Sequence, residues 1–584
     1  MGPCKAYVAL SAFSLLSLLV CCGRARADSY EWERMQHVLR VHGLELAEQP
    51  EGKRIAWIRV VRDEVFVEDE VWPTWLNWFH ATTREAVVRR ELLFTSGAPY
   101  VDARVEESMR NLRGMAIFAL VRIAAVQGRT SDEVGVLVHT RDLWSLRAET
   151  DFSLSHIVDQ FLLRVTERNF LGRNTALSAD FLWLPRSYEL GQDYTSRRVW
   201  ASTVQLQETA RVVFNRYTRR AEGSTWALKL GEPFYNLRQR FAWLASFAYD
   251  TRVARLLDGL ENTTFPTPKQ DPDGPYAQRI WRSRIGTGSA YSYLRLGEAF
   301  KQTWALGWDV RSYQYDPNAE TMLPPELAAA FELSQDGIPR DRREIGPAFS
   351  YDILIPQYAR FVNLATYGVT ENVRVGPSAG VTARAPLRAF GSDTNSWVFT
   401  MRVGCILAPA GWLLEGSVAG RTRYEGERLV DQRLQALVRG ATPVLFDWFR
   451  LVSRMTVDAR RNDTAKTYVT LGANNGLRGY YSQSFRVSGA SYVLANFELR
   501  TRPLEWQAVQ VGGVLFYDTG SVYRKFSELT MHHAVGIGLR VLFPQLNRTP
   551  FSIDEGMGMD PSLRLVPTIK DGQVVPLTAI EDPP

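Results

Sequence analysis

Cysteine is scarce in this 584-residue sequence and is concentrated at its start. Cys4, Cys21 and Cys22 all lie near the N-terminus, which leaves Cys405 alone in the rest of the chain. A single cysteine can form no internal disulfide and builds no cysteine-based metal site. The sequence therefore predicts no disulfide and no cysteine-based metal site. No other metal and no cofactor are expected either.

The first 27 residues have the pattern of a signal peptide. Lys5 supplies a positive charge, Ala6–Cys22 is an uncharged apolar run, and Ala25–Ala27 is a small-x-small cleavage site. A membrane anchor is one alternative, but the apolar run is too short to span a bilayer. A lipoprotein anchor at Cys22 is another, which the preceding Val20-Cys21 pair disfavours. We therefore predict that residues 1–27 are removed and that 28–52 form a linker or short helix.

The chain also lacks a large excess of positive charge. The formal net charge of +6 falls to +3 when Lys5, Arg24 and Arg26 leave with the signal peptide. No long basic block occurs in the remaining chain. Nucleic acid is therefore not expected as a partner.

After the signal peptide the sequence has no uncharged apolar run of about 18 residues, so transmembrane helices are not expected. Aromatic residues nevertheless make up 12% of the chain, with 17 Trp and 23 Tyr. An exported chain of this kind can enter a membrane as a closed β-barrel, in which every backbone polar group is hydrogen-bonded.

Patterns that support catalysis are absent as well. The seven histidines are scattered, and His532 and His533 are adjacent, so they point to opposite faces of a strand. Gly286-Thr287-Gly288 has no following phosphate-binding helix and fits a turn. No serine nucleophile elbow or pair of catalytic carboxylates is evident, and the chain is not predicted to be an enzyme.

Residues 53–148 have the pattern of one α/β domain. A strand-like run from Ile55 precedes two helical segments, the second with Val105, Met109 and Leu112 on one apolar stripe. Two alternating strands follow, at 116–125 and 134–140. The expected order is β-α-α-β-β, with two helices on one face of a three-stranded sheet.

From residue 149 onward the pattern changes to segments of about ten alternating residues separated by turn residues. In one such segment Trp304, Leu306, Trp308 and Val310 alternate with small or charged residues. A soluble β-sandwich also alternates, but it would not crowd tryptophan outside and charge inside. We therefore predict a mainly β protein whose residues 149–584 form a transmembrane antiparallel barrel of about sixteen strands, at ~25–28 residues per strand and connection, with a short C-terminal tail.

Three charged residues near the end of the barrel region form a candidate site. Period-two geometry turns Glu498 and Asp518 toward the lumen, and Arg478 lies on a glycine-rich loop before their strands. A guanidinium offers planar forked donors to carboxylates, so an inward fold of the loop would create a barrel lock of Arg478, Glu498 and Asp518. The alternative is three separate lumenal charges that each meet water.

The residues around this site resemble motifs of the BamA/TamA superfamily of outer-membrane proteins (bacterial surface antigen type). Leu477, Arg478, Gly479 and Tyr480 are similar to its loop-six motif, and the stretch from Phe516 to Gly520 resembles the strand that carries a lumenal partner of that arginine. Residues 53–148 resemble one POTRA domain of this family.

The resemblance implies an outer-membrane barrel of a Gram-negative cell, with the POTRA domain in the periplasm. It implies a role in inserting or translocating unfolded outer-membrane or secreted client proteins, which the POTRA sheet binds by β-augmentation. Membrane lipid and periplasmic or lipoprotein accessory proteins are the other implied partners. A passive pore, a structural barrel and a dedicated two-partner-type secretion transporter are the alternatives.

Two features differ from the family pattern. The sequence indicates one POTRA domain rather than several, and it ends Ile580-Glu581-Asp582-Pro583-Pro584 instead of in a strand with a terminal aromatic residue. Either the closing strand lies within 562–580 and a short tail follows it, or the barrel closes differently.

Overall fold

The computed structural model describes residues 27–571, together with Gln573 and Val575. Within 27–571 the residues outside the description are 68–71, 155–157, 185, 256, 259–260, 263, 266–276, 279, 317–339, 368–369, 465–466, 482–484, 489–490, 507–508 and 561–564. The predicted signal peptide lies outside the described residues, apart from Ala27. No helix in the described part of the chain is long and apolar enough to cross a membrane.

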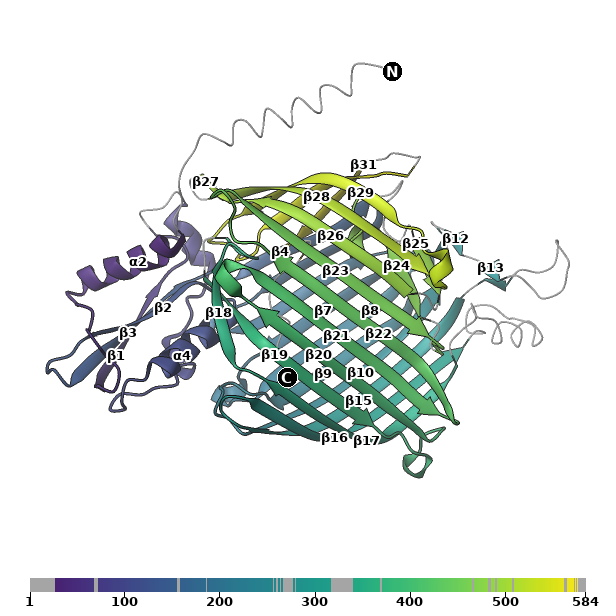
Figure 1. Ribbon diagram of the computed structural model, residues 1–584, viewed down its shortest axis with the longest axis horizontal. Coiled ribbons are helices and arrows are strands. Elements are labelled where there is room, and N and C mark those ends of the chain that lie inside the picture. Colours follow the sequence, from purple (N-terminus) through teal and green to yellow (C-terminus); the bar gives the residue numbers. More distant parts are fainter. Residues whose placement is uncertain are drawn as a thin grey trace, which may run out of the picture.

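An α/β domain opens the described chain and lies against one end of a large barrel (Figure 1). Its elements in chain order are β1 (Arg54–Asp63), the 3₁₀ helix η2 (Thr74–Phe79), α3 (Glu85–Arg90), α4 (Asp102–Gly114), β2 (Phe118–Gln127) and β3 (Glu133–Asp142). The sheet order is β1-β3-β2, with β1 parallel and β2 antiparallel to β3. The assignment of residues 53–148 as a POTRA domain stays a prediction.

Both faces of this sheet are covered. The apolar stripe of α4, with Val105 and Leu112, packs on one face against residues such as Val136. On the other face lies α2 (Ala27–Val41), whose Met35 contacts a cluster containing Leu137. The segment 28–52, expected to be a linker or short helix, thus contributes a helix to the core.

The barrel wall contains 22 strand segments among the described residues. They are β4 (Leu146–Leu154), β5 (Val158–Glu167), β6 (Thr175–Trp183), β7 (Ser187–Ser196), β8 (Gln205–Asn215), β9 (Ala221–Glu232), β10 (Phe241–Arg255), β15 (Ile280–Leu296), β16 (Lys301–Asp316), β17 (Arg342–Leu354), β18 (Gln357–Val362), β19 (Thr370–Arg384), β20 (Ser396–Leu407), β21 (Leu413–Glu425), β22 (Arg428–Ala441), β23 (Phe449–Arg461), β26 (Ser491–Thr501), β27 (Leu504–Trp506), β28 (Val509–Tyr523), β29 (His532–Leu542), β30 (Phe551–Gly558) and β31 (Leu565–Asp571). Short two-stranded pairs, β11–β12 (Leu257–Asp258, Glu261–Asn262), β13–β14 (Thr264–Phe265, Ala277–Gln278) and β24–β25 (Tyr468–Leu471, Phe485–Ser488), stand beside it.

The wall has about 20 strands, because two of its segments continue a neighbour. Both β17 and β18 pair along β19, and both β26 and β27 pair along β28. The expectation of about sixteen strands was too low. It assumed long connections, whereas Gly426 and Glu427 alone join β21 to β22.

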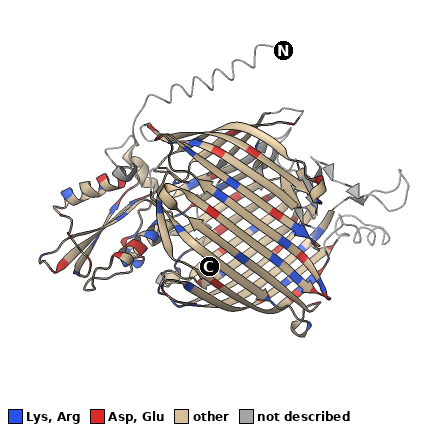
Figure 2. Ribbon diagram, viewed as in Figure 1, with Lys and Arg blue, Asp and Glu red and all other residues tan. Residues whose placement is uncertain are grey.

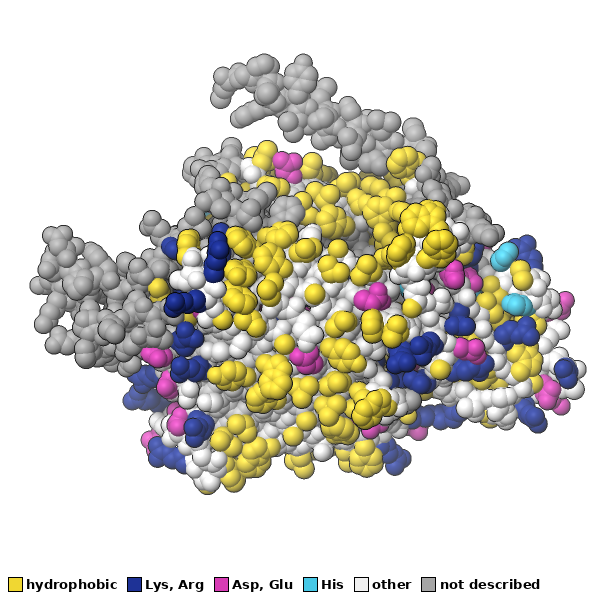
Figure 3. Space-filling model, turned by 180° about the vertical axis from the view of Figure 1, so that it is seen from behind, with side chains coloured by type: hydrophobic (Ala, Val, Ile, Leu, Met, Phe, Trp, Pro, Cys, Tyr) yellow, Lys and Arg dark blue, Asp and Glu magenta, His cyan; other side chains and the backbone are white. Residues whose placement is uncertain are grey.

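Side chains alternate across the wall as the sequence predicts. On β16, Trp304, Leu306 and Trp308 are exposed, while Ala305 and Asp309 are buried. Figure 3 shows the outward side chains as an apolar band over the middle of the barrel, with charged side chains toward both ends. Figure 2 shows basic and acidic residues distributed together along the strands.

The barrel closes where β31 meets β4, and this seam is weakly paired. Ile569 opposite Phe152 is the single backbone pair among the described residues, against 15 pairs between β15 and β16. The closing strand β31 falls within 562–580, which matches the first of the two closure alternatives.

A polar joint connects the α/β domain to the barrel. Asp142 Oδ2 lies 3.0 Å from His80 Nε2 and accepts a 2.6 Å hydrogen bond from the Thr83 amide. Ser145 Oγ lies 3.1 Å from His80 Nδ1 and donates to Glu167 on β5 at 2.9 Å. Serine, histidine and aspartate meet here as in a hydrolase. However, Ser145 is buried and donates its hydrogen bond to Glu167 rather than to His80, so the set holds the domain to the wall.

Candidate functional site

A loop between β24 and β25 folds back into the barrel and carries Arg478. Its ends are joined by the Ala473 amide, which donates to the Tyr480 carbonyl at 2.9 Å. Gly476 and Gly479 turn the chain with φ of 108° and 88°, a region that glycine adopts without strain. A Cβ on Gly479 would also lie 2.9 Å from the Gly558 nitrogen of β30, so a larger residue would push the loop off the wall.

The base of the loop is anchored by apolar packing. Leu477 is fully buried in a cluster with Leu471 and Leu494. The Tyr480 hydroxyl donates to the His533 carbonyl on β29 at 2.9 Å. These contacts fix the direction in which Arg478 points.

Arg478 is fully buried and contacts three carboxylates. Its Nε and Nη2 donate to Asp518 Oδ2 and Oδ1 at 2.7 and 2.8 Å, a forked pair. Its Nη1 donates to Glu498 Oε1 at 2.7 Å and to Asp554 Oδ2 at 2.9 Å. The guanidinium carbon lies 3.6 Å from the ring centre of Phe516, which supports it from below by a cation–π contact.

Two further arginines complete the set of charges. Arg500 donates from Nε to Glu498 Oε2 at 2.8 Å, and Arg540 pairs with Asp554. Three arginines therefore face three carboxylates, which we call the lumenal ion network (Arg478, Arg500, Arg540, Glu498, Asp518, Asp554). Mutual neutralisation offsets the large desolvation penalty that each buried charge would otherwise carry.

Asn496 ties the loop to this network through two hydrogen bonds from its side-chain amide. Its Nδ2 donates to Asp518 Oδ1 at 2.8 Å and to the Gly476 carbonyl at 2.6 Å. The loop backbone and the carboxylate are thus held by the same side chain, so movement of one disturbs the other.

Comparison with known families supplies the context for this geometry. The Omp85 superfamily domain matches residues 466–554, which contain the loop and all six charged residues of the network. This part of the chain is therefore an Omp85 superfamily domain. The sequence-based resemblance to the BamA/TamA group is therefore confirmed at the level of this superfamily.

Solved Omp85-type barrels match this chain only distantly. BamA from Haemophilus ducreyi lacking POTRA domains 1–3 has 12% identity and a TM-score of 0.32, over 94% of each chain. CdiB from Acinetobacter baumannii has 10% identity and a TM-score of 0.40, over 89% of this chain and 74% of CdiB. CdiB from Escherichia coli has 11% identity and a TM-score of 0.42, over 91% of this chain and 80% of CdiB. These values are too low to carry an argument, and no curated protein matches the chain.

The structure brings the predicted residues of this Omp85 site together. Arg478 contacts both Glu498 and Asp518, and Phe516 lies beneath it. Gly520 does not touch the arginine. A Cβ there would meet Leu471 and Leu494 at 3.2 Å, so this glycine makes room for the packing at the base of the loop.

Sequence reasoning missed Asp554, Arg500, Arg540 and Asn496. Asn496 and Arg500 lie two residues before and after Glu498, so strand alternation puts them on the same face, but nothing in the spacing links them to the lock. Asp554 had a usable signal, because β30 alternates Ser552, Asp554 and Gly556 on its buried face. The two glycines of that strand, Gly556 and Gly558, are where the loop approaches closely.

Proposed function

We propose that this protein is an outer-membrane barrel that assists the insertion or translocation of other proteins. The observation that carries the proposal is the seam. One backbone pair joins β31 to β4 among the described residues, against seven between β30 and β31 and nine between β4 and β5. Strand edges left unpaired at such a seam offer amide and carbonyl groups to an extended client chain.

The lumenal ion network supports this role, because it ties together the wall beside the seam. Glu498, Asp518, Arg540 and Asp554 lie on β26, β28, β29 and β30, and β31 is the next strand. The seam can then separate while the loop holds these four strands in register. Arg478, Glu498 and Asp518 act in this proposal as a barrel lock rather than as chemical groups.

The α/β domain is proposed to face the periplasm and to deliver clients to the end of the barrel against which it lies. Residues 45–47 already pair with the end of β2, through the Ala47 amide to the Ala125 carbonyl and the Gln127 amide to the Glu45 carbonyl. The outer edge of β1 over 59–63 has no such backbone partner among the described residues. We therefore assign client pairing to β1.

A reversible crosslink across the seam tests the proposal. Phe152→Cys with Ile569→Cys places two cysteines on directly opposed residues, a separation that a disulfide bridges. The control is Thr382→Cys with Thr400→Cys, an opposed pair in the fully paired β19–β20 ladder. Client insertion into proteoliposomes should stop when the seam pair is oxidised and resume on reduction, while the control stays active.

Full insertion activity with the seam crosslinked would contradict the proposal and favour a passive or structural barrel. Depletion of the protein in cells then separates the two active roles. Broad loss of outer-membrane barrels indicates an insertase, whereas loss of one secreted product indicates a dedicated transporter.

A further inference from the structure

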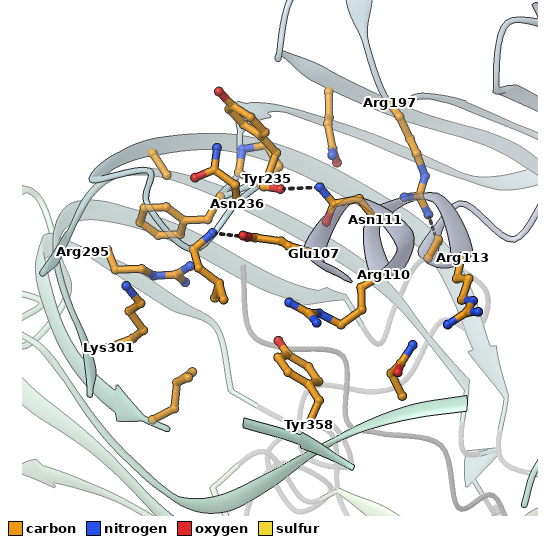
Figure 4. Close-up of a pocket in the computed structure, with 18 of the residues that line it drawn as sticks. Glu107, Arg110, Asn111, Arg113, Arg197, Tyr235, Asn236, Arg295, Lys301 and Tyr358 are labelled. Carbon is orange, nitrogen blue, oxygen red and sulfur yellow. Dashed lines mark hydrogen bonds between the residues drawn. The ribbon is translucent and has the colours of Figure 1, made fainter. Parts of the chain in front are cut away.

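A cavity of about 890 Å³ lies between the α/β domain and the mouth of the barrel. One wall is α4, whose Glu107, Arg110 and Asn111 point into it, and the opposite wall is formed by barrel residues such as Lys301 (Figure 4). The cavity is held in place by contacts between the domain and the barrel. Asn111 donates to the Tyr235 carbonyl at 3.1 Å, and the Leu237 amide donates to Glu107.

The lining of this cavity is strongly basic, with seven lysine and arginine residues against two carboxylates. Both carboxylates are already bound by backbone amides. Glu107 accepts from Leu237, and Glu371 accepts from Leu364, Ala365 and Thr366 at 2.9–3.1 Å. Neither carboxylate forms an ion pair with a cation of the cavity among the described residues.

Four of these cations have no carboxylate partner among the described residues. Arg110 lies 4.5 Å from the ring centre of Tyr358, and Lys301 donates to the Gly297 carbonyl at 2.7 Å. Arg548 donates to the Arg113 carbonyl at 2.8 Å, and the side chain of Lys229 makes no hydrogen bond or ion pair to the described residues.

Arginines deeper in the lumen behave differently. Arg255 pairs with Glu222 at 2.6 Å, and Arg211 pairs with Asp193 at 2.8 Å. These two arginines of the wall are thus matched by acids, unlike the four cations of the mouth cavity. Burial, with the charge of Arg113 beside it, lowers the pKa of Arg548, as expected for cations crowded without a counter-ion.

From this charge distribution we infer that the cavity binds an acidic segment of an extended peptide. This inference rests on the proposed function: an acidic segment is the part of a client that enters the cavity first. The cations stand on separate elements rather than converging on one point, which fits charges spaced along a chain. The cavity is near the upper end of the ~300–1,000 Å³ of ligand pockets, and the rings of Phe234 and Tyr358 offer apolar contacts between the charges.

Peptide binding to the full-length protein in nanodiscs tests this inference. The probe is a fluorescein-labelled octapeptide rich in Asp and Glu, compared by anisotropy with the same peptide carrying Asn and Gln. The test variant is Arg110→Gln with Lys229→Gln. The control is Arg220→Gln with Arg428→Gln, two exposed cations at turns on the opposite end of the barrel. Heat-modifiable gel mobility verifies that each variant is folded.

The acidic peptide should bind more tightly than its amide analogue, and the preference should fall with salt. Replacing the two cations should weaken binding of the acidic peptide about fivefold or more. Each partly exposed ion pair between a cation and the peptide contributes up to ~1 kcal/mol, and 1.4 kcal/mol corresponds to a tenfold change in affinity. The control variant should bind like the wild type. Equal affinity for both peptides, or unchanged binding by the test variant, would overturn the inference.

Competition and activity measurements separate the remaining outcomes. If inorganic phosphate displaces the acidic peptide at concentrations where chloride does not, the cavity is a small-anion site and the peptide assignment is wrong. If client insertion proceeds normally but the acidic peptide has no preference, the inference fails while the proposed function stands. Tight peptide binding without any client insertion would support the inference and contradict the proposed function.

Discussion

Replacing Arg478 with alanine removes the one group that touches all three carboxylates of the lumenal ion network. Glu498 keeps Arg500 at 2.6 Å, and Asp554 keeps Arg540. Asp518 loses both arms of its forked ion pair and retains Asn496 as its side-chain donor. The damage is therefore concentrated on one buried carboxylate.

The magnitude follows from that single uncompensated charge. Removing one partner of a buried ion pair costs about 3–5 kcal/mol, and the hydrogen bond that Asp518 keeps from Asn496 places this case near the lower limit. We expect Arg478→Ala to destabilise the barrel by about 3 kcal/mol and to reduce client insertion more than barrel abundance. The readouts are the temperature at which heat-modifiable mobility is lost and the rate of client insertion.

Companion variants separate the ion pair from general damage to the loop. Arg478→Lys should rescue poorly, because an ammonium cannot make the forked contact with Asp518 and still reach Glu498. Adding Asp518→Asn to Arg478→Ala should recover part of the loss, since no unpaired carboxylate then remains. Arg402→Ala is the matched control. Its pair with Asp352 is half exposed and contributes at most ~1 kcal/mol.

Wild-type heat resistance and normal insertion by Arg478→Ala would refute the reasoning, because the contacts would then carry no net free energy. Additive losses from Arg478→Ala and charge reversal at Asp518 would also contradict it. Residues of one network are expected to be strongly non-additive.

Three further changes test other parts of the molecule. Val121→Asp places a charge on a strand residue that is 2% exposed, so it should destabilise the α/β domain by about 3 kcal/mol or more. The domain should become protease-sensitive while the barrel stays heat-modifiable. A protease-resistant domain would contradict this prediction. Ending the chain at Asp571 removes Val575, whose carbonyl accepts from Arg500 at 2.6 Å, so heat resistance should fall; an unchanged transition would mean that the tail is passive. Burial raises the pKa of Asp63, but the hydrogen bond from His139 together with the charges of His139, Arg34 and Arg141 outweighs burial, so the pKa of Asp63 lies below its ordinary value. The resulting stability is present above pH ~3.9 and is lost as the pH falls further. Asp63→Asn should therefore make the stability of the α/β domain depend less steeply on pH in acid. A pH dependence as steep as that of the wild type would contradict the role given to Asp63.

Much of the fold and half of the lumenal ion network could be predicted from local pattern. Period-two alternation turned Glu498 and Asp518 inward, because strand geometry alone fixes which face a residue occupies. The contact of Arg478 with these two carboxylates was a weaker prediction, because it depended on the fold of a loop. Asp554 could not be paired with it from spacing, because the contact is made across the wall and depends on how close the loop comes to β30.

The strand count and the closure were harder to predict, for a different reason. Periodicity shows that a strand exists but not how many residues its connection uses, and connections as short as Gly426–Glu427 raised the number of strands. Without a terminal aromatic residue, the sequence left two ways for the barrel to close. The answer depends on Ile569 meeting Phe152, a pairing between residues more than 400 positions apart that no local signal specifies.

The strength of the wall is unevenly distributed in a way that suits an openable barrel. On one side of the seam, β26 to β30 are tied together by the loop and the buried charges, and the chain beyond β31 reaches back to Arg500 and Arg540 through Val575 and Gln573. On the other side, β4 is bound to β5 by an ordinary ladder and to β31 by a single described pair. Separation at the seam would therefore break few hydrogen bonds, whereas separation anywhere in β26–β30 would also expose paired charges. Under the proposed function, the ion network would direct an opening to the seam without strengthening the seam itself.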